Sequence, residues 1–190
     1  MSKAGYSISN LVADLRDICA NFTDEHEILI RVRPLAQRAA LSKDAWLEKR
    51  FYQADSDQGF GVYLLHEEPD HRLAIFALSW LPNRGAPPHD HGTWAVVAGV
   101  DGPEKNVFWE RVDDRSRAGY AEIKKTGEKV FDVGDVIAMP QGTIHSVWNE
   151  TEAVTLSLHM YGKHINYTER SQFDPQSRTQ RPFKVKVTGW

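Results

Sequence analysis

The stretch that decides the fold is GDVIAMPQGTIHSVWN, residues 134–149. Its first two residues, 134–135, are a hairpin-turn signal, and residues 136–139 form a short apolar run typical of a strand. A second turn signal, Pro-Gln-Gly, occupies residues 140–142, and His145 begins the next strand. The pattern therefore predicts a tight turn that delivers a histidine to the start of a strand.

Short β-rich runs separated by Gly, Pro, Asn and Asp surround this stretch. Many short strands at such spacing are typical of a β-sandwich or barrel. The predicted strands cover residues 61–65, 72–81, 93–100, 105–112, 121–125, 129–133, 136–139, 145–149 and 154–160. An alternating run at 183–187 is predicted to add an edge strand.

The first fifty or so residues have a helical pattern instead. From Ile8 to Cys19, apolar residues recur at the 3.6-residue period, with Ser9 or Asn10 as the predicted cap. A second helical pattern is interrupted by Pro34, and a third follows residue 42.

These patterns predict one mainly β domain over residues 1–190. Residues 1–55 form an N-terminal helical cap, residues 56–165 the β-barrel core, and residues 166–190 a C-terminal extension. A chain of this length buries an adequate core as one domain.

Composition excludes several classes of function. The formal net charge is -3 and the bases are mixed with acids, so no basic stripe for nucleic acid is present. Cys19 is the only cysteine, which excludes an internal disulfide and suits a reducing compartment. Residues 1–10 contain no apolar signal segment, and no run reaches the roughly 18 apolar residues of a membrane span. We expect a cytoplasmic protein with neither a membrane nor a nucleic acid as partner.

A second histidine motif lies in the segment GAPPHDHGTWAV, residues 85–96. His89 and His91 are two residues apart after a Pro-rich turn, so both project from one face of the entrance to a strand. Such a pair can chelate one metal ion. Taken alone, however, the pair is better explained by chance, and His145 taken alone is better explained as a satisfied buried histidine.

Together the two segments resemble the two motifs of the cupin superfamily. The segment from Gly134 to Asn149 fits the pattern Gly-x5-Pro-x-Gly-x2-His-x3-Asn at every fixed position. The resemblance implies a double-stranded β-helix, or jelly-roll, barrel with a metal bound by His89, His91 and His145.

The first segment departs from the cupin pattern at the position of a carboxylate ligand. The glutamate expected four or five residues after His91 is replaced by Ala95 or Val96. A set of three neutral histidines leaves the metal more positive and keeps positions open for other ligands. All-nitrogen ligation suits zinc, copper or nickel as well as iron.

The last core strand, LSLHMY at residues 156–161, carries a further polar set. Ser157, His159 and Tyr161 share one face, while the other face is apolar. Such a face is either the polar outside of an edge strand or the lining of a cavity. With three histidine ligands and no glutamate, the chain resembles the thiol dioxygenases, the group of cysteine dioxygenase and bacterial 3-mercaptopropionate dioxygenase.

That resemblance implies an Fe(II) enzyme whose partners are a small thiol and O2. Both oxygen atoms are added to the thiol sulfur to give a sulfinate. Tyr161 is implied to orient bound oxygen or substrate, supported by His159 and Ser157. The similarity extends from about Tyr63 to about Arg170.

The substrate-binding residues differ from those of mammalian-type cysteine dioxygenases. Those enzymes hold the substrate carboxylate with an arginine upstream of the metal motif, and this chain lacks it, because the corresponding region reads Val62, Tyr63, Leu64. No cysteine follows His91, which excludes a Cys–Tyr crosslink. In the bacterial mercaptopropionate enzymes an arginine nine residues after the tyrosine holds the carboxylate, and here that residue is Arg170. On composition alone, Arg170 is better explained as a solvent-exposed arginine. Arg84 and His164 are further candidate anion contacts for a substrate such as mercaptosuccinate.

Three hypotheses follow from the sequence. The first is a thiol dioxygenase acting on a 3-mercaptopropionate-, cysteine- or mercaptosuccinate-like compound. The second is a cupin metalloenzyme of another reaction type, an isomerase or a dioxygenase that cleaves a carbon–carbon bond. The third is a non-catalytic cupin that binds a small ligand. The sequence leaves homo-oligomer formation open.

Overall fold

Two helices begin the chain in the computed structural model, which describes residues 5–188. Helix α1 spans Ile8–Asn21 and helix α2 spans Glu25–Leu41. The cap of α1 is Ser7, not Ser9 or Asn10, because the Ser7 hydroxyl accepts the backbone N–H of Asn10 at 3.2 Å. The amphipathic pattern therefore located α1 correctly, but its cap lies slightly earlier.

The rest of the helical cap differs from the prediction. Pro34 does not interrupt the second helix, because α2 continues through it. The third pattern forms two short 3-10 turns, Lys43–Ala45 and Lys49–Tyr52. These turns lead the chain from the helices into the first strand. Neither helix has the length and apolar character that a membrane crossing requires within the described chain.

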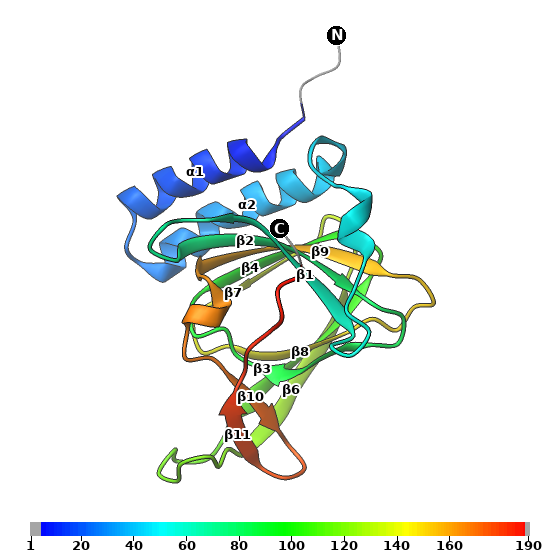
Figure 1. The fold of residues 1–190 in the computed structure, drawn as a ribbon. Coiled ribbons are helices and arrows are strands. Elements are labelled where there is room, and N and C mark those ends of the chain that lie inside the picture. Colours follow the sequence, from blue (N-terminus) through cyan, green and yellow to red (C-terminus); the bar gives the residue numbers. More distant parts are fainter. Residues whose placement is uncertain (1–4, 189–190) are drawn as a thin grey trace.

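Eleven strands in the described chain form two antiparallel sheets that face each other (Figure 1). The five-stranded sheet has the order β1 (Phe60–Glu67), β2 (Arg72–Trp80), β9 (Thr155–Lys163), β4 (Ala95–Asp101) and β7 (Val136–Met139). The six-stranded sheet has the order β11 (Thr179–Pro182), β10 (Ser171–Asp174), β3 (Gly85–His89), β8 (Ile144–Trp148), β5 (Glu104–Arg111) and β6 (Ile123–Phe131). The predicted β-barrel with a helical N-terminus is confirmed.

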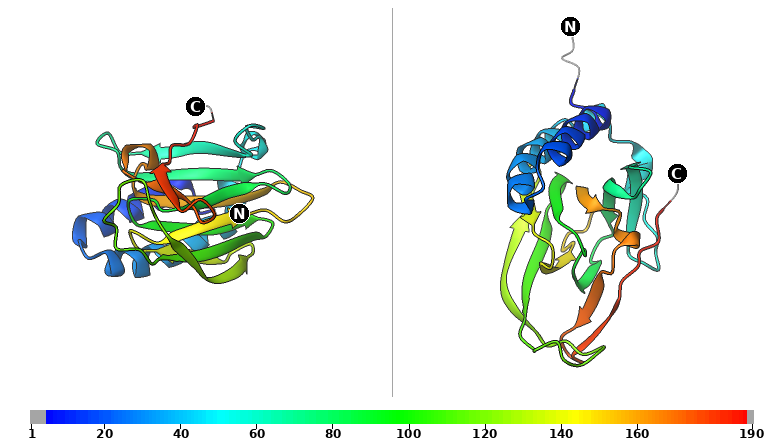
Figure 2. Two further views of the ribbon diagram at one scale, coloured as in Figure 1. Left: turned by 90° about the horizontal axis from the view of Figure 1, so that it is seen from below. Right: turned by 90° about the vertical axis from the view of Figure 1, so that its left-hand side faces the viewer.

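Both helices cover the outer face of the five-stranded sheet (Figure 2). Alternation along the strands separates two apolar clusters. On β9, Leu156, Leu158 and Met160 pack with the helices, whereas Tyr161 belongs to the cluster inside the barrel. The interior between the two sheets is therefore where Ser157, His159 and Tyr161 project.

Several strand predictions were wrong in detail. The predicted runs at 121–125 and 129–133 are parts of one strand, β6. The Pro-rich turn before His89 is strand β3. Strands β10 and β11 were not predicted, whereas the predicted edge strand at 183–187 is an extended segment outside the ladder. This segment is nevertheless held by backbone hydrogen bonds. In one of them the Phe183 N–H donates to the Arg170 carbonyl at 3.0 Å.

Candidate metal centre

Three buried histidines meet inside the barrel. His89 ends β3 and is paired directly across the ladder with His145 on β8. His91 lies two residues beyond the end of β3, and all three side chains are at most 5% exposed. One nitrogen from each lies within 4.8 Å of the others. The structure thus brings together the three predicted ligands in a cluster able to hold a metal ion.

His91 is positioned by the turn that follows it. Gly92 has φ +64°, a left-handed conformation that glycine adopts without steric cost. A Cβ at Gly92 would lie 2.9 Å from Cβ of Thr168, and the Thr168 hydroxyl donates to the His91 carbonyl at 2.8 Å. Contact with the segment before β10 therefore fixes the backbone of His91.

Hydrogen bonds to Nδ1 set the tautomers of the His89 and His145 rings. Nδ1 of His89 lies 2.7 Å from the Pro87 carbonyl oxygen, and Nδ1 of His145 lies 2.9 Å from Oδ1 of Asn106. Both oxygens accept only, so each Nδ1 carries the proton and each Nε2 presents a lone pair. The Nε2 atoms of His91 and His145 face each other at 3.3 Å. This donor set fits a metal ion.

Burial keeps the cluster neutral. It lowers the pKa of His89 and of His91 well below the ordinary value, with the neighbouring His145 and Arg170 adding to the effect. It also lowers the pKa of His145 to about 3. Neutral imidazole is the form that binds metal. The ligands are thus in their binding form at neutral pH.

A chain of hydrogen bonds runs along β9 toward the cluster. Oγ of Ser157 lies 2.9 Å from Nε2 of His159, and Nδ1 of His159 lies 2.8 Å from the Tyr161 hydroxyl. The Trp80 indole N–H donates to the Ser157 hydroxyl at 3.2 Å. The ring of Tyr161 lies 5.1 Å from that of His91, measured between centroids. These residues connect the barrel interior to the histidine cluster.

Burial also determines the charge state of this chain. It lowers the pKa of His159 to about 3 and raises the pKa of Tyr161 above its ordinary value. At neutral pH the imidazole is therefore neutral and the phenol is protonated. The hydrogen bond between His159 Nδ1 and the Tyr161 hydroxyl therefore joins two neutral groups.

Arg170 is buried beside the cluster, contrary to its reading as a surface arginine. Its side chain is 3% exposed, and its Nε donates to the Phe183 carbonyl at 2.9 Å. Its Nη2 has no hydrogen-bond partner. Burial lowers its pKa to about 10, so the guanidinium remains charged at neutral pH. A buried guanidinium with an unpaired nitrogen is costly, and Asp90 is a nearby acid whose charge offsets part of that cost.

These groups line one cavity. The three histidines, His159, Tyr161 and Arg170 line it together, and Val62 is among its apolar residues. Its volume is about 20 Å³, close to the space of a single water molecule. Phe183 and Val185 of the C-terminal segment form part of its wall. A substrate larger than water therefore needs side chains around this cavity to rearrange.

Arg84 and His164 do not line this cavity. The Arg84 guanidinium donates to the carbonyls of Ser56 and Asp57 at 3.3 and 3.1 Å. His164 is buried and accepts the backbone N–H of Asn166 through Nδ1 at 3.1 Å. The structure thus assigns both residues to local hydrogen bonding, and neither meets an anion in the histidine cavity.

Sequence reasoning missed Asn106 and Glu104, which lie on β5. Asn106 holds His145, and Glu104 is a buried carboxyl group beside Ser157, Thr155 and Trp80. Oε1 of Glu104 has no hydrogen-bond partner, and burial raises the Glu104 pKa to about 8. The alternation of inward and outward side chains along β5 could have identified Asn106, because its neighbours Lys105 and Val107 face outward. Glu104 is the first residue of the strand and directly follows a turn, so no pattern in the sequence marked it.

Comparison with known proteins finds similarity at the level of solved structures. No protein family and no curated protein matches the sequence. Oxalate oxidase in complex with glycolate matches with 15% identity and a TM-score of 0.46, over 62% of this chain and 59% of that chain. The DMSP lyase from Ruegeria pomeroyi matches with 15% identity and a TM-score of 0.46, over 68% and 60%.

A third similar structure is the cupin domain of Schizosaccharomyces pombe Cnp3, with 10% identity and a TM-score of 0.44 over 56% of this chain and 63% of that one. The chain spans about 59% of the oxalate oxidase that it matches. These solved structures include cupin-superfamily proteins. The chain itself has two antiparallel sheets that form a barrel, two N-terminal helices and a buried histidine cluster that is a candidate metal site.

Proposed function

We propose that the protein is a non-haem iron thiol dioxygenase that adds O2 to the sulfur of a small thiol carboxylate. The substrate class includes 3-mercaptopropionate, cysteine and mercaptosuccinate. A reducing compartment such as the cytoplasm would keep such a thiol reduced.

The observation that carries this proposal is the position of Arg170. Arg170, whose Nη2 has no hydrogen-bond partner, lines the same cavity as the three histidines and Tyr161. A guanidinium binds a carboxylate through two parallel hydrogen bonds. A substrate held there by its carboxylate has its other end near the histidine nitrogens, where a thiolate is a suitable metal ligand.

Charge balance favours such a substrate. Three neutral imidazoles leave the full charge of a divalent metal uncompensated, and Arg170 adds a further positive charge. A thiolate and a carboxylate on one molecule supply two negative charges to these two cations. Iron, when bound, would supply coordination of the thiolate and activation of O2.

The overall reaction balances without a further reactant. One thiol and one O2 give one sulfinic acid, with both oxygen atoms bound to sulfur. Sulfur loses four electrons and O2 gains them, so no reductant is consumed. Phe183 and Val185 form part of the cavity wall and so limit the access of water to this chemistry.

Tyr161, His159 and Ser157 are assigned the handling of protons and orientation. The Tyr161 hydroxyl can donate to a group at the metal while His159 Nδ1 bonds to it at 2.8 Å. Ser157 holds the opposite nitrogen of His159 at 2.9 Å. The relay thereby fixes the direction of the phenol hydrogen.

The test is O2 uptake by the Fe(II)-loaded protein with 3-mercaptopropionate, cysteine, mercaptosuccinate and cysteamine, with sulfinate identified by mass. Cysteamine lacks a carboxylate and is the matched control. We expect uptake with equimolar sulfinate for the carboxylated thiols, and a much higher KM for cysteamine. Absence of sulfinate with every thiol would refute the proposal and favour a different reaction at the same metal site.

A further inference from the structure

A basic groove is lined by residues of the β5–β6 loop, of β10–β11 and of the segments that flank this hairpin. The β10–β11 hairpin lies at the end of the barrel away from the helices (Figure 1). The groove has a volume of about 670 Å³. Pockets of this size, in the range of roughly 300 to 1,000 Å³, accommodate small molecules. The groove is therefore large enough for a metabolite-sized ligand.

The groove is strongly positive although the chain as a whole has a net charge of -3. Its lining includes the exposed cations Arg115, Arg117, Arg181 and Lys184, and Glu169 as an acid. Within residues 5–188, no carboxylate lies within ion-pair distance of these four cations. Clustered charges of one sign in a concave site raise the local concentration of the opposite ion.

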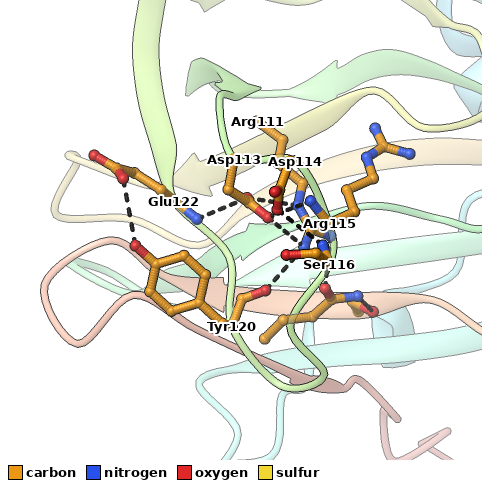
Figure 3. A network of polar contacts seen from close by, with 9 residues as sticks. Arg111, Asp113, Asp114, Arg115, Ser116, Tyr120 and Glu122 are labelled. Carbon is orange, nitrogen blue, oxygen red and sulfur yellow. Dashed lines mark hydrogen bonds and ion pairs between the residues drawn. The ribbon is translucent and has the colours of Figure 1, made fainter.

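A network of polar contacts fixes the loop that carries two of these cations (Figure 3). Arg111 binds Asp113 through two parallel contacts at 2.8 and 2.9 Å, and its third nitrogen donates to Gln180 at 2.7 Å. Asp113 also accepts the backbone N–H of Arg115 at 2.9 Å. The charge of Arg111 is thereby neutralised by Asp113, while Arg115 is left to a ligand.

The backbone of Arg115 supports the same conclusion. Its φ of 62° lies in the left-handed region, which a non-glycine residue adopts at some energetic cost. The bond from its N–H to Asp113 compensates for that conformation. The loop thus has a defined shape that presents Arg115 at the groove.

Arg170 connects the groove to the histidine cavity. It is among the residues that line each of them. Its guanidinium also lies 4.3 Å from the centroid of the Phe183 ring, which belongs to the wall of the inner cavity. An anion in the groove is therefore next to the residue proposed to hold the substrate carboxylate.

We propose that this basic groove binds a small molecule with at least two carboxylate or phosphate groups. Arginine side chains offer paired N–H donors to either group, and several separated cations favour a polyvalent anion over a monovalent one. If the thiol dioxygenase function also holds, the groove is the outer chamber from which an anionic thiol reaches Arg170. That second statement rests on the proposed function, whereas anion binding itself does not.

The test is calorimetric titration of the purified protein, without thiol, at low ionic strength. Tricarballylate probes polycarboxylates, pyrophosphate probes phosphates, and acetate is the monovalent control. We expect one tricarballylate or pyrophosphate per chain, bound more tightly than acetate and weakened by added salt. The double variant Arg115→Ala/Arg117→Ala should bind at least tenfold more weakly.

The matched control is Arg33→Ala, an exposed arginine on α2 outside the groove, which should bind as the wild type does. Arg181→Ala is a second variant and should also weaken binding, because Arg181 is exposed in the groove. Equal weakening by Arg33→Ala, an unchanged double variant, or no binding of either probe would overturn the proposal. Sulfinate formation without anion binding would refute only the proposal that the groove binds anions. Anion binding without sulfinate formation would refute only the proposed thiol dioxygenase function.

Discussion

The Nε2 atoms of His91 and His145 lie 3.3 Å apart inside the barrel. His145 cannot donate from this nitrogen while its Nδ1 donates to Asn106 at 2.9 Å. Without a metal, a proton on Nε2 of His91 pairs the two nitrogens as donor and acceptor. A metal ion bound there would instead take the lone pair of each nitrogen, which requires the His91 proton to lie on Nδ1.

The first prediction concerns metal retention. We expect His89→Ala and His145→Ala to abolish iron binding, because each removes one of three ligands. Asn106→Ala should weaken the affinity roughly 10- to 100-fold, since it only frees the His145 ring to rotate. Metal content after dialysis, measured by elemental analysis, tests this order. The control His26→Ala, an exposed histidine on α2, should retain the wild-type content.

The second prediction concerns Tyr161. Tyr161→Phe should lower kcat by on the order of 100-fold while iron stays bound, because the phenol hydrogen is lost but no ligand is removed. Steady-state kinetics and metal content together provide the test. Tyr63→Phe is the control, because the Tyr63 hydroxyl bonds to the Gln53 carbonyl at 2.8 Å. Equal kinetics for Tyr161→Phe and the wild type would remove Tyr161 from the mechanism.

The third prediction concerns Arg170. Arg170→Gln should raise KM for carboxylated thiols roughly 10- to 100-fold, the loss expected for hydrogen bonds to a charged group. Cysteamine should respond little, since it has no carboxylate. Comparing KM for 3-mercaptopropionate and for cysteamine in both proteins separates carboxylate binding from a general disturbance of the cavity. A parallel rise for both thiols would contradict the assignment.

Sequence patterning predicted the parts of the site that depend on local alternation. Ser157, His159 and Tyr161 could be assigned to one face because β9 is regular, and the turn before His145 has a strong signal. Strand β3 was missed because Pro87 and Pro88 argue against a ladder. The ladder tolerates them because its register shifts between Ala86 and His89, so the prolines lie at the irregularity.

Other parts of the site depend on contacts between distant segments, which no local pattern records. Arg170 could not be distinguished from a surface arginine until Phe183 and the cavity were placed around it. Strands β10 and β11 are four residues each and largely polar, so they lack the apolar alternation on which the other predictions relied.

The last prediction uses the buried carboxyl group of Glu104. Burial raises its pKa to about 8 in the folded state, against 4.5 for the ordinary group. Between these values the folded protein holds a proton that the unfolded chain has released, so unfolding releases a proton. Raising the pH therefore favours unfolding, and the contribution of Glu104 to the free energy of unfolding falls by up to about 1.4 kcal/mol per pH unit.

Glu104→Gln keeps the size of the side chain and removes this titration. We expect the variant to gain stability relative to the wild type as pH rises from about 5 to about 8. Urea unfolding of both proteins at several pH values gives the difference directly, and Glu110→Gln, an exposed site on the same strand, is the control. A difference that does not change with pH would mean that Glu104 titrates outside this window. The hydroxyls of Ser157 and Thr155 would then stabilise its charged form more than its burial disfavours it.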